Sequence, residues 1–168
     1  MDRNATVSPV IGSILMIVLT LIVAAIVGSF TGGIVETKGK LPSVRLEVEF
    51  SQTGNLSMVH TAGDPIPLSQ ISLQLTPSQT FGSDAIKHSR TIDKTKFQDK
   101  MGVPWGDIAV MQVGDRHHIA QVDIAVLDAG ETDVHYKVTD STNIGRTFYL
   151  EIYYENTLIA KPEVLIKA

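Results

Sequence analysis

The five histidines are the side chains of this chain best suited to bind a metal ion or to transfer protons near neutral pH. They are His60, His88, His117, His118 and His135. Adjacent residues of a strand point to opposite faces of the sheet, so His117 and His118 cannot easily chelate one ion. We expect the histidines to serve packing or surface roles, and we predict no metal site and no cofactor.

One acidic turn offers oxygen ligands of the kind that calcium prefers. The sequence DAGETD, residues 128–133, places Asp128, Glu131 and Asp133 in one short loop. Carboxylates in a loop can hold calcium, but most acidic turns are simply solvated, and solvation is the interpretation that we favour here. The sequence GDP at residues 63–65 invites a similar structural interpretation, in which Asp64 caps a turn before Pro65.

Trp105, the single tryptophan, and Asn55 are two further candidate functional residues. An exposed tryptophan can stack on a sugar, but we expect Trp105 to anchor its loop on the domain. Asn55 begins an Asn-Leu-Ser triplet, which is an acceptor sequence for N-glycosylation. We expect Asn55 in a hairpin turn and treat it as a candidate glycosylation site.

Enzyme signatures are absent from the sequence. It contains no G-x-S-x-G, no Walker A loop, no H-E-x-x-H and no G-x-G-x-x-G. There is no cysteine, which excludes disulfides and thiolate chemistry. The net charge of −4 argues against a nucleic-acid-binding protein, which would carry a clustered basic face. We therefore predict a protein that is not an enzyme and that has no nucleic-acid partner.

The N-terminal part of the chain is a long apolar segment. Residues 4–35 carry no charge, and a helix over residues 10–30 would span roughly 31 Å, about the thickness of the hydrocarbon core of a membrane. A secretory signal has an apolar stretch of only about 7–15 residues. Because β-branched residues surround this helix, it must be buried in lipid or among other helices. It is a membrane anchor, a retained assembly element or a discarded signal.

The remainder of the chain has the pattern of a β domain. The sequence SVRLEVEF, residues 43–50, alternates apolar and polar side chains, and LSMVH returns after the turn SQTGN, which predicts a hairpin. The segment 81–106 is expected to be a loop with one helical turn near 93–100. The fold class predicted is α+β: a long hydrophobic α-helix followed by an all-β antiparallel, Ig-like sandwich. Further strands are expected at 71–76, 108–113, 118–127, 134–138, 147–154 and 162–168.

Two stretches carry a resemblance to a known family. The sequence VSPVIGSILMIVLTLIVAAIVGSF, residues 7–30, closely resembles the N-terminal segment of archaeal type IV pilins. The sequence HTAGDPIPLSQISLQL, residues 60–75, resembles a His-x-x-Gly-Asp-x-Ile-x-Leu stretch often found in their head domains. The first stretch is the more specific of the two.

The resemblance implies a class III signal peptide, which a prepilin peptidase removes before the apolar helix. It divides the chain into a leader (1–5), a hydrophobic assembly or transmembrane helix (6–36), a linker (37–42) and a head domain (43–168). The bond cut is expected between Ala5 and Thr6. The family usually has a basic residue two positions before the cut, and Arg3 stands there only if the cut follows Asn4, which is the alternative.

The resemblance further implies a subunit of an archaeal cell-surface filament for adhesion. The subunit would sit in the cytoplasmic membrane before an assembly platform and its ATPase extract it. It would then form a helical homopolymer with itself, with or without minor pilins. A monomeric, membrane-anchored extracellular sandwich that binds a ligand or acts as a surface enzyme is the alternative, and a secreted protein is a third. The residues expected in the filament core are Val10, Ile11, Ile14, Leu15, Ile17, Val18, Leu21, Ile22, Ala25, Ile26 and Gly28.

Overall fold

A computed structural model describes residues 9–33 and 40–168, with side chains for residues 10–26 and 40–168. The chain divides into two compact units, one ending at Lys40 and one beginning at Leu41. The expected leader, residues 1–5, and residues 37–39 of the expected linker lie outside the described residues.

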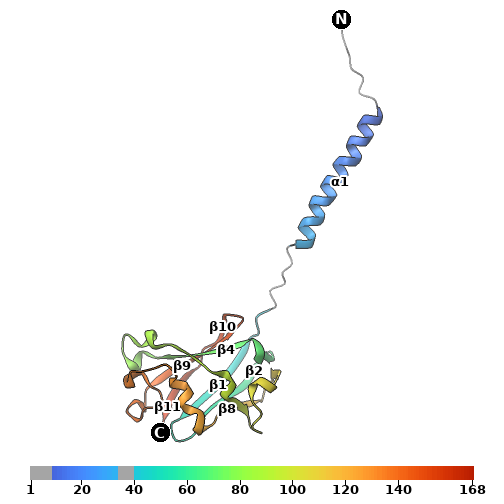
Figure 1. Cartoon of the computed structure of the whole chain (residues 1–168). Coiled ribbons are helices and arrows are strands. Elements are labelled where there is room, and N and C mark those ends of the chain that lie inside the picture. Colours follow the sequence, from blue (N-terminus) through green and yellow to red (C-terminus); the bar gives the residue numbers. More distant parts are fainter. Residues whose placement is uncertain (1–8, 34–39) are drawn as a thin grey trace. The chain divides into compact units, whose positions relative to one another are not determined.

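The first unit contains one long helix, α1, which spans Pro9–Gly33 (Figure 1). Proline is well tolerated at the first helical position, because the N–H that it lacks would have no partner inside the helix. After Pro9, the helix contains no further proline. Within the described residues, no helix is both long enough and apolar enough to cross a membrane.

The second unit is built on a nine-stranded β-sheet with the order β5-β4-β9-β11-β1-β2-β8-β6, in which β10 pairs with β9 beside this path. A separate two-stranded sheet joins β3 and β7. The strands are β1 (Val44–Ser51), β2 (Leu56–Gly63), β3 (Ile66–Pro67), β4 (Ile71–Pro77), β5 (Arg90–Ile92), β6 (Phe97–Asp99), β7 (Val110–Met111), β8 (Arg116–Ile119), β9 (Thr147–Tyr154), β10 (Thr157–Ala160) and β11 (Glu163–Lys167).

Short 3₁₀ helices lie between the strands of this unit. They are η1 (Leu68–Gln70), η2 (Gln79–Phe81), η3 (Ala85–His88), η4 (Lys94–Lys96), η5 (Trp105–Asp107), η6 (Gln121–Asp128), η7 (Val134–Tyr136) and η8 (Ser141–Asn143).

The sheet is mixed and strongly curled, so that it forms a half-barrel rather than the predicted Ig-like sandwich (Figure 1). The expectation is confirmed for the α+β class and the β-rich head. It is wrong for the antiparallel topology, because β11 runs parallel to β1, with Phe50 opposite Ile166. The last strand of the chain lies between β1 and β9, which places it antiparallel to β9 and parallel to β1.

The core lies inside the curl of the sheet. Leu46 and Phe50 of β1 are buried, whereas Glu47 and Glu49 are exposed, as the predicted alternation requires. The rings of Phe50 and Phe148 meet edge to face with their centroids 5.7 Å apart, which joins β1 to β9 across the core. Edge-to-face contacts of this kind add to the stabilisation from apolar burial.

The strand predictions succeed where side chains alternate along a strand. The hairpin of β1 and β2 is present, with Val48 opposite Met58, and β4, β9 and β11 lie where they were expected. Of the expected strand 108–113, only Val110 and Met111 form a strand, β7. The expected strand 118–127 is wrong beyond the end of β8, because residues 121–128 form η6, and the expected strand 134–138 begins as η7.

The segment 81–106 is more ordered than the predicted loop. It holds the short strands β5 and β6, and η4 at Lys94–Lys96 matches the helical turn that was expected near 93–100. β5 pairs with β4 and β6 with β8, so this segment supplies strands at both ends of the curled sheet.

Candidate functional site

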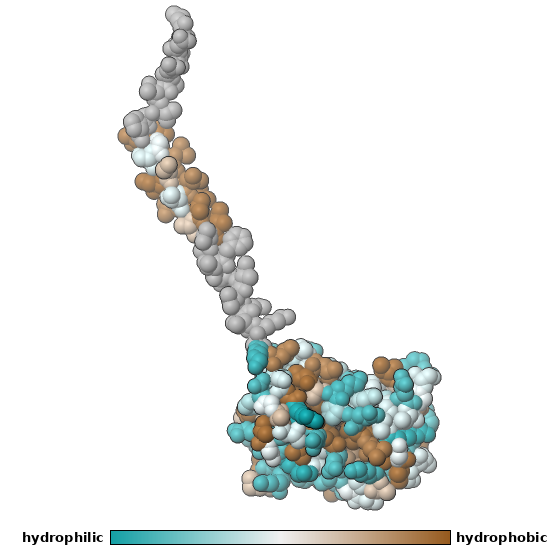
Figure 2. Space-filling view, turned by 180° about the vertical axis from the view of Figure 1, so that it is seen from behind, coloured by the Kyte–Doolittle hydropathy of each residue, from teal (hydrophilic) through white to brown (hydrophobic). Residues whose placement is uncertain are grey.

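Helix α1 presents apolar side chains to every side. The residues predicted for the filament core between Val10 and Ile26 are all exposed, and Met16 is the most exposed of the large apolar side chains described there, at 72%. Figure 2 shows the helix as hydrophobic colour interrupted by a few paler patches. The side chains that follow Ile26, at the predicted core position Gly28 and beyond, lie outside the described side chains.

The two hydroxyl groups among the described side chains of α1, those of Ser13 and Thr20, are satisfied within the helix itself. Ser13 Oγ donates to the carbonyl oxygen of Val10 at 2.9 Å, and Thr20 Oγ1 donates to that of Ile17 at 2.8 Å. Serine and threonine in helices commonly bond back to the preceding turn in this way. Neither hydroxyl proton therefore requires a partner from outside the helix.

A helix with these properties is unstable alone in water and stable in apolar surroundings. Burying one large aliphatic side chain contributes roughly 1.5–3 kcal/mol, and the described helix exposes many of them. Such a helix is accommodated by lipid or by other helices. Against other helices, small residues such as Gly12, Ser13 and Ala25 allow close backbone approach.

The head domain begins with a two-way clamp between Ser43 and Asp64. The Ser43 N–H donates to Asp64 Oδ2 at 3.0 Å, and the Asp64 N–H donates to the Ser43 carbonyl oxygen at 2.8 Å. Gly63 makes this approach possible: its φ is +114°, and a Cβ at that position would lie 2.0 Å from the Ser43 oxygen. The clamp fixes the start of β1 against the end of β2, and it lies within the second stretch that resembles pilins.

A buried ionic cluster holds the long connection between β8 and β9 to β5. Arg90 of β5 is 8% exposed in its side chain, and its guanidinium donates to the Asp128 carboxylate and to the carbonyl oxygens of Leu127, His88 and Tyr136. Asp128 also accepts from the N–H groups of Val138 and Thr139, both at 2.9 Å. Each charge in this pair therefore has several partners.

Glu131 completes the cluster. Its carboxylate accepts from His88 Nδ1 at 2.9 Å and from the Asp133 N–H at 2.9 Å, and Arg90 lies 3.8 Å away. Burial by itself raises the pKa of Glu131, but the hydrogen bonds from Asp133 and His88 and the charges of His88 and Arg90 outweigh it, so the pKa lies below its ordinary value. Glu131 is therefore held as a carboxylate.

This arrangement corrects the interpretation of the acidic turn as a solvated loop. The side chains of Asp128 and Glu131 are 6% and 7% exposed, and protein groups occupy their oxygens. Asp133 caps η7 through the His135 N–H. The calcium alternative is not supported either, because within residues 10–26 and 40–168 no three potential ligand side chains are placed to hold a metal ion.

The histidine pair and the tryptophan lie as predicted. His117 is buried, while His118 lies on the other face of β8, with its Nε2 3.2 Å from the Gln98 amide nitrogen. His60 is buried and contacts the Ala62 carbonyl oxygen through Nε2. Trp105 is buried and stacks on Phe97 with a centroid distance of 4.7 Å, which confirms that it anchors its loop.

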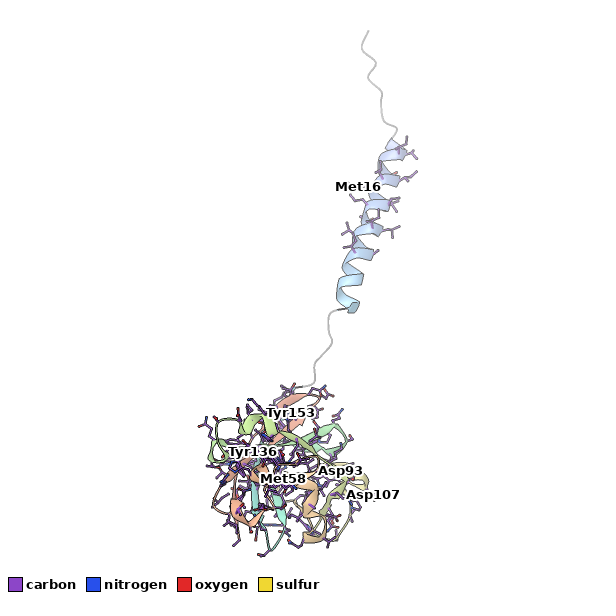
Figure 3. The ribbon with its side chains drawn as sticks, turned by 60° about the vertical axis from the view of Figure 1, so that its left-hand side comes forward. Met16, Met58, Asp93, Asp107, Tyr136 and Tyr153 are labelled. Carbon is purple, nitrogen blue, oxygen red and sulfur yellow. The ribbon has the colours of Figure 1, made fainter. Side chains whose placement is uncertain are left out.

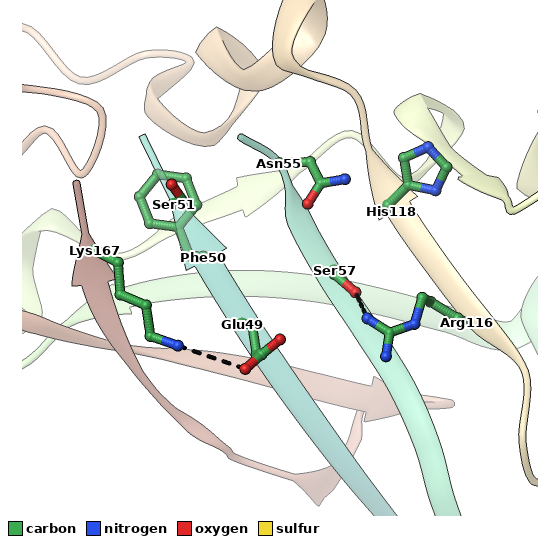
Figure 4. Close-up of a pocket in the computed structure, with 8 residues that line it drawn as sticks. All are labelled: Glu49, Phe50, Ser51, Asn55, Ser57, Arg116, His118 and Lys167. Carbon is green, nitrogen blue, oxygen red and sulfur yellow. Dashed lines mark hydrogen bonds and ion pairs between the residues drawn. The ribbon is translucent and has the colours of Figure 1, made fainter. Parts of the chain in front are cut away.

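Asn55 lies exposed in the turn between β1 and β2, where the sequence placed it. It borders a shallow hollow of about 220 Å³ on the outer face of β1, β2 and β8 (Figure 4). Arg116 lies across this hollow and donates to Ser57 Oγ at 2.8 Å, and Lys167 pairs loosely with Glu49 at 3.5 Å. An acceptor side chain at this position is accessible to a modifying enzyme.

Sequence reasoning missed Arg90 and Lys94 as organising residues. Lys94 Nζ donates to the carbonyl oxygens of Leu68, Ser69 and Ile71 at 2.9–3.0 Å, which caps η1 from a different part of the chain. Apart from the bond of Arg90 to the His88 carbonyl oxygen, both residues act on partners more than twenty positions away, so no local pattern in the sequence marks them. The residues expected at the leader cleavage site, Arg3 to Thr6, lie outside the described residues.

Residues 5–46 match the family model described as "Archaeal Type IV pilin, N-terminal". The chain therefore carries the N-terminal domain of archaeal type IV pilins, and the resemblance seen in residues 7–30 is confirmed. A curated relative from Archaeoglobus fulgidus, described as an uncharacterized protein, is 39% identical over 75 residues, which cover 44% of this chain and 52% of that relative. The chain thus spans about half the length of the curated relative that it matches.

Proposed function

We propose that this chain is a structural, non-enzymatic subunit of an archaeal type IV pilus-like surface filament that serves adhesion. A prepilin peptidase removes residues 1–5, and the subunit waits in the cytoplasmic membrane until an ATP-driven platform adds it to the filament. The α1 helices of successive copies pack as the core, and the heads face the medium. Minor pilins of the same class are further partners.

The observation that carries this proposal is the surface of α1. A helix that is apolar on all sides and that satisfies its own hydroxyl protons can be transferred from lipid to a bundle of like helices without uncovering a polar group. The match of residues 5–46 to the pilin N-terminal domain supports the same reading. The head supports it as well, since its buried charges are partnered within the head.

The proposal is tested by placing a charge in the helix. Ile17→Asp should abolish filaments, because a carboxylate at the centre of an apolar helix costs about 2.5–3.5 kcal/mol in apolar surroundings, and every subunit of the polymer would bear this cost. The measurement is electron microscopy of the cell surface together with recovery of sedimentable filaments. Filaments of normal abundance from this variant would overturn the proposal.

Two matched variants separate assembly from folding. Ile17→Leu keeps the apolar surface and should retain filaments. Ile86→Asp makes the same change at an isoleucine of the head that is already exposed, so the head should remain folded. If the unaltered chain is found only as single subunits in the membrane, the anchored-domain alternative is the correct one.

Leader removal is tested by the mass and the N-terminal sequence of the subunit from the cell surface. A chain that begins at Thr6, or at Ala5 if the cut follows Asn4, with the apolar helix retained, agrees with the proposal. A chain that begins after the apolar segment shows a discarded signal, and an intact Met1 shows a plain anchor.

Asn55 is proposed to carry an N-linked glycan on the exposed head. The support is its acceptor triplet and its exposure in the β1–β2 turn. Asn55→Gln should lower the mass of the mature subunit by far more than the substitution explains. A mass that changes only by the substitution would show that Asn55 is unmodified.

A further inference from the structure

The outward side chains of β1, β2 and β8 form a face on which acidic and basic groups are separated by strand. Directly opposed residues of neighbouring strands lie on the same face of a sheet. The carboxylates stand on β1, the basic side chains stand on β8, and uncharged side chains stand between them on β2. The two rows that make up this β1–β2–β8 face are Glu47–Val59–Arg116 and Glu49–Ser57–His118.

The charges on the two sides of this face are not paired with each other inside the head. Neighbouring strands lie about 4.8 Å apart, so β1 and β8 are separated by about 9.5 Å. Arg116 donates to Ser57 Oγ at 2.8 Å. Within residues 10–26 and 40–168, neither Arg116 nor Glu47 forms an ion pair. Glu49 contacts only Lys167, at 3.5 Å and with both side chains more than half exposed. These charges therefore remain available to a partner.

The middle of the face is small and partly apolar. Val59 is half-buried, and Ser57 is 6% exposed. Longer side chains, among them those of Arg116 and His118, surround Ser57 and leave above it the hollow of about 220 Å³ (Figure 4). An apolar centre with a polar, charged rim is the usual anatomy of a protein–protein interface.

The separation of charge makes the face complementary to a second copy of itself. A two-fold axis that runs parallel to β2 brings the β1 side of one head over the β8 side of the other and keeps each residue in its row. Glu47 of each copy then faces Arg116 of the other copy, and Glu49 faces His118. An axis across the strands would instead place β1 over β1 and oppose like charges, which is unfavourable.

We propose that the β1–β2–β8 face binds the same face of a second copy about a two-fold axis parallel to β2. Each pair of opposite charges occurs twice, and the two Val59 side chains meet at the axis. Such self-complementary contacts are the commonest in soluble oligomers. Three strands give a face smaller than a standard interface of about 1,600 Å², so single heads bind weakly. In the proposed filaments, rows of heads would add many such contacts between neighbouring filaments.

Asn55 borders the same face, immediately before β2 (Figure 4). Because β2 lies along the axis, the Asn55 residues of two paired heads approach each other. A glycan on Asn55 would therefore hold the two faces apart, and bare heads pair whereas modified heads do not. This last step rests on the glycan proposed above, while the pairing of bare heads does not.

The chain contains no cysteine, so a single introduced cysteine can report the pairing. Val59→Cys places a thiol at the axis of the full chain, which is made in a bacterial host without the glycan and kept in detergent micelles. Val134→Cys, at an exposed valine of η7, is the matched control and measures the linking that α1 association alone produces. Yields of dimer with a short bismaleimide are divided by the labelling of each thiol with N-ethylmaleimide. We expect about tenfold more dimer from Val59→Cys at low salt and a smaller ratio at 1 M salt, because salt screens the charges.

Charge reversal shows whether the predicted pairs form. In the Val59→Cys chain, Glu47→Arg and Arg116→Glu each oppose like charges at two contacts, and each should lower the dimer yield about fivefold. The double variant restores opposite charges in reversed order and should recover at least half of the yield. Lys87→Glu makes the same change in net charge as Arg116→Glu at an exposed lysine of η3, and it should leave the yield unchanged.

The proposal is overturned if Val59→Cys gives no more dimer than Val134→Cys. It is also overturned if both single charge reversals leave the yield unchanged, or if the double variant fails to recover it. The glycan is tested with the Val59→Cys chain from the native cell, in which Asn55→Gln should raise the yield. Equal yields there contradict the role of the glycan and leave the result of the charge reversals standing.

Discussion

Met16 and Met58 carry the same side chain but lie in opposite environments, one exposed and one buried (Figure 3). Met16 of α1 is 72% exposed among other exposed apolar residues, whereas Met58 of β2 is 1% exposed in the core of the head. The head encloses its apolar side chains and pairs its buried charges with its own residues. The helix requires an apolar surface that comes from outside the described chain.

This difference separates the stabilisation of the head, which comes from its own core, from the stabilisation of α1, which comes from association. The head should fold and unfold through its own core, so substitutions there should change its free energy of unfolding. Substitutions on α1 should change association and leave the head unaffected. The predictions below test the self-sufficiency of the head, in order of decreasing effect.

The largest effect is expected at the buried ionic cluster. Arg90→Met removes the guanidinium and leaves two buried carboxylates, those of Asp128 and Glu131, without their main cation. Breaking one side of a buried ion pair costs about 3–5 kcal/mol, which thermal or urea unfolding of the head will measure. Lys87→Met, which removes an exposed pair with Asp84, is the control and should cost less than about 1 kcal/mol. Equal effects of the two variants would show that the cluster is not a main source of stability.

A smaller loss is expected at the Ser43–Asp64 clamp. Gly63→Ala adds a Cβ only 2.0 Å from the Ser43 carbonyl oxygen at a positive φ, and should cost about 2–3 kcal/mol. Gly82→Ala is a matched control, because Gly82 has nearly the same φ, +113°, but nothing lies within 4 Å of its added Cβ. Urea unfolding of both variants isolates the cost of the close contact. If Gly82→Ala is as destabilising as Gly63→Ala, backbone strain alone accounts for the effect.

The smallest effect is a dependence of head stability on pH. The pKa of Glu131 is lower in the folded head than its ordinary value of 4.5. Its contribution is therefore fully present above pH 4.5 and is lost as the pH falls through the folded pKa. Unfolding midpoints measured from pH 7 down to pH 3 should fall more steeply for the unaltered chain than for Glu131→Gln. Parallel curves would show that Glu131 gains nothing from its partners.

The sequence predicted those parts of the molecule whose pattern is local. The charge-free segment predicts α1, and the alternation of SVRLEVEF predicts β1 with Leu46 and Phe50 facing inward. The functional interpretation also depends on a local pattern, the Val-Ser-Pro-Val-Ile-Gly run. The placement of His117 and His118 on opposite faces of the sheet was predicted from the geometry of a strand, because adjacent residues of a strand point to opposite sides.

The remaining parts depend on contacts that are distant in sequence. The segment 121–128 contains enough apolar residues to form a strand, but it forms the 3₁₀ helix η6. Its last residues are held by side chains rather than by a neighbouring strand: Arg90 bonds the Leu127 carbonyl oxygen, and Asp128 bonds the N–H groups of Val138 and Thr139. No alternation in a single sequence reveals such partners. The parallel pairing of β11 with β1 also joins the two ends of the head and could not be inferred from either strand alone.

The central claim is that α1 is buried by other copies of itself. A cryo-electron microscopy reconstruction of filaments from the native cell surface tests it most directly. The account predicts a bundle of continuous helices along the filament axis, one from each subunit, with the β heads arranged around it. A filament whose axis is built from β heads, or whose subunits lack the α1 helix, would contradict it.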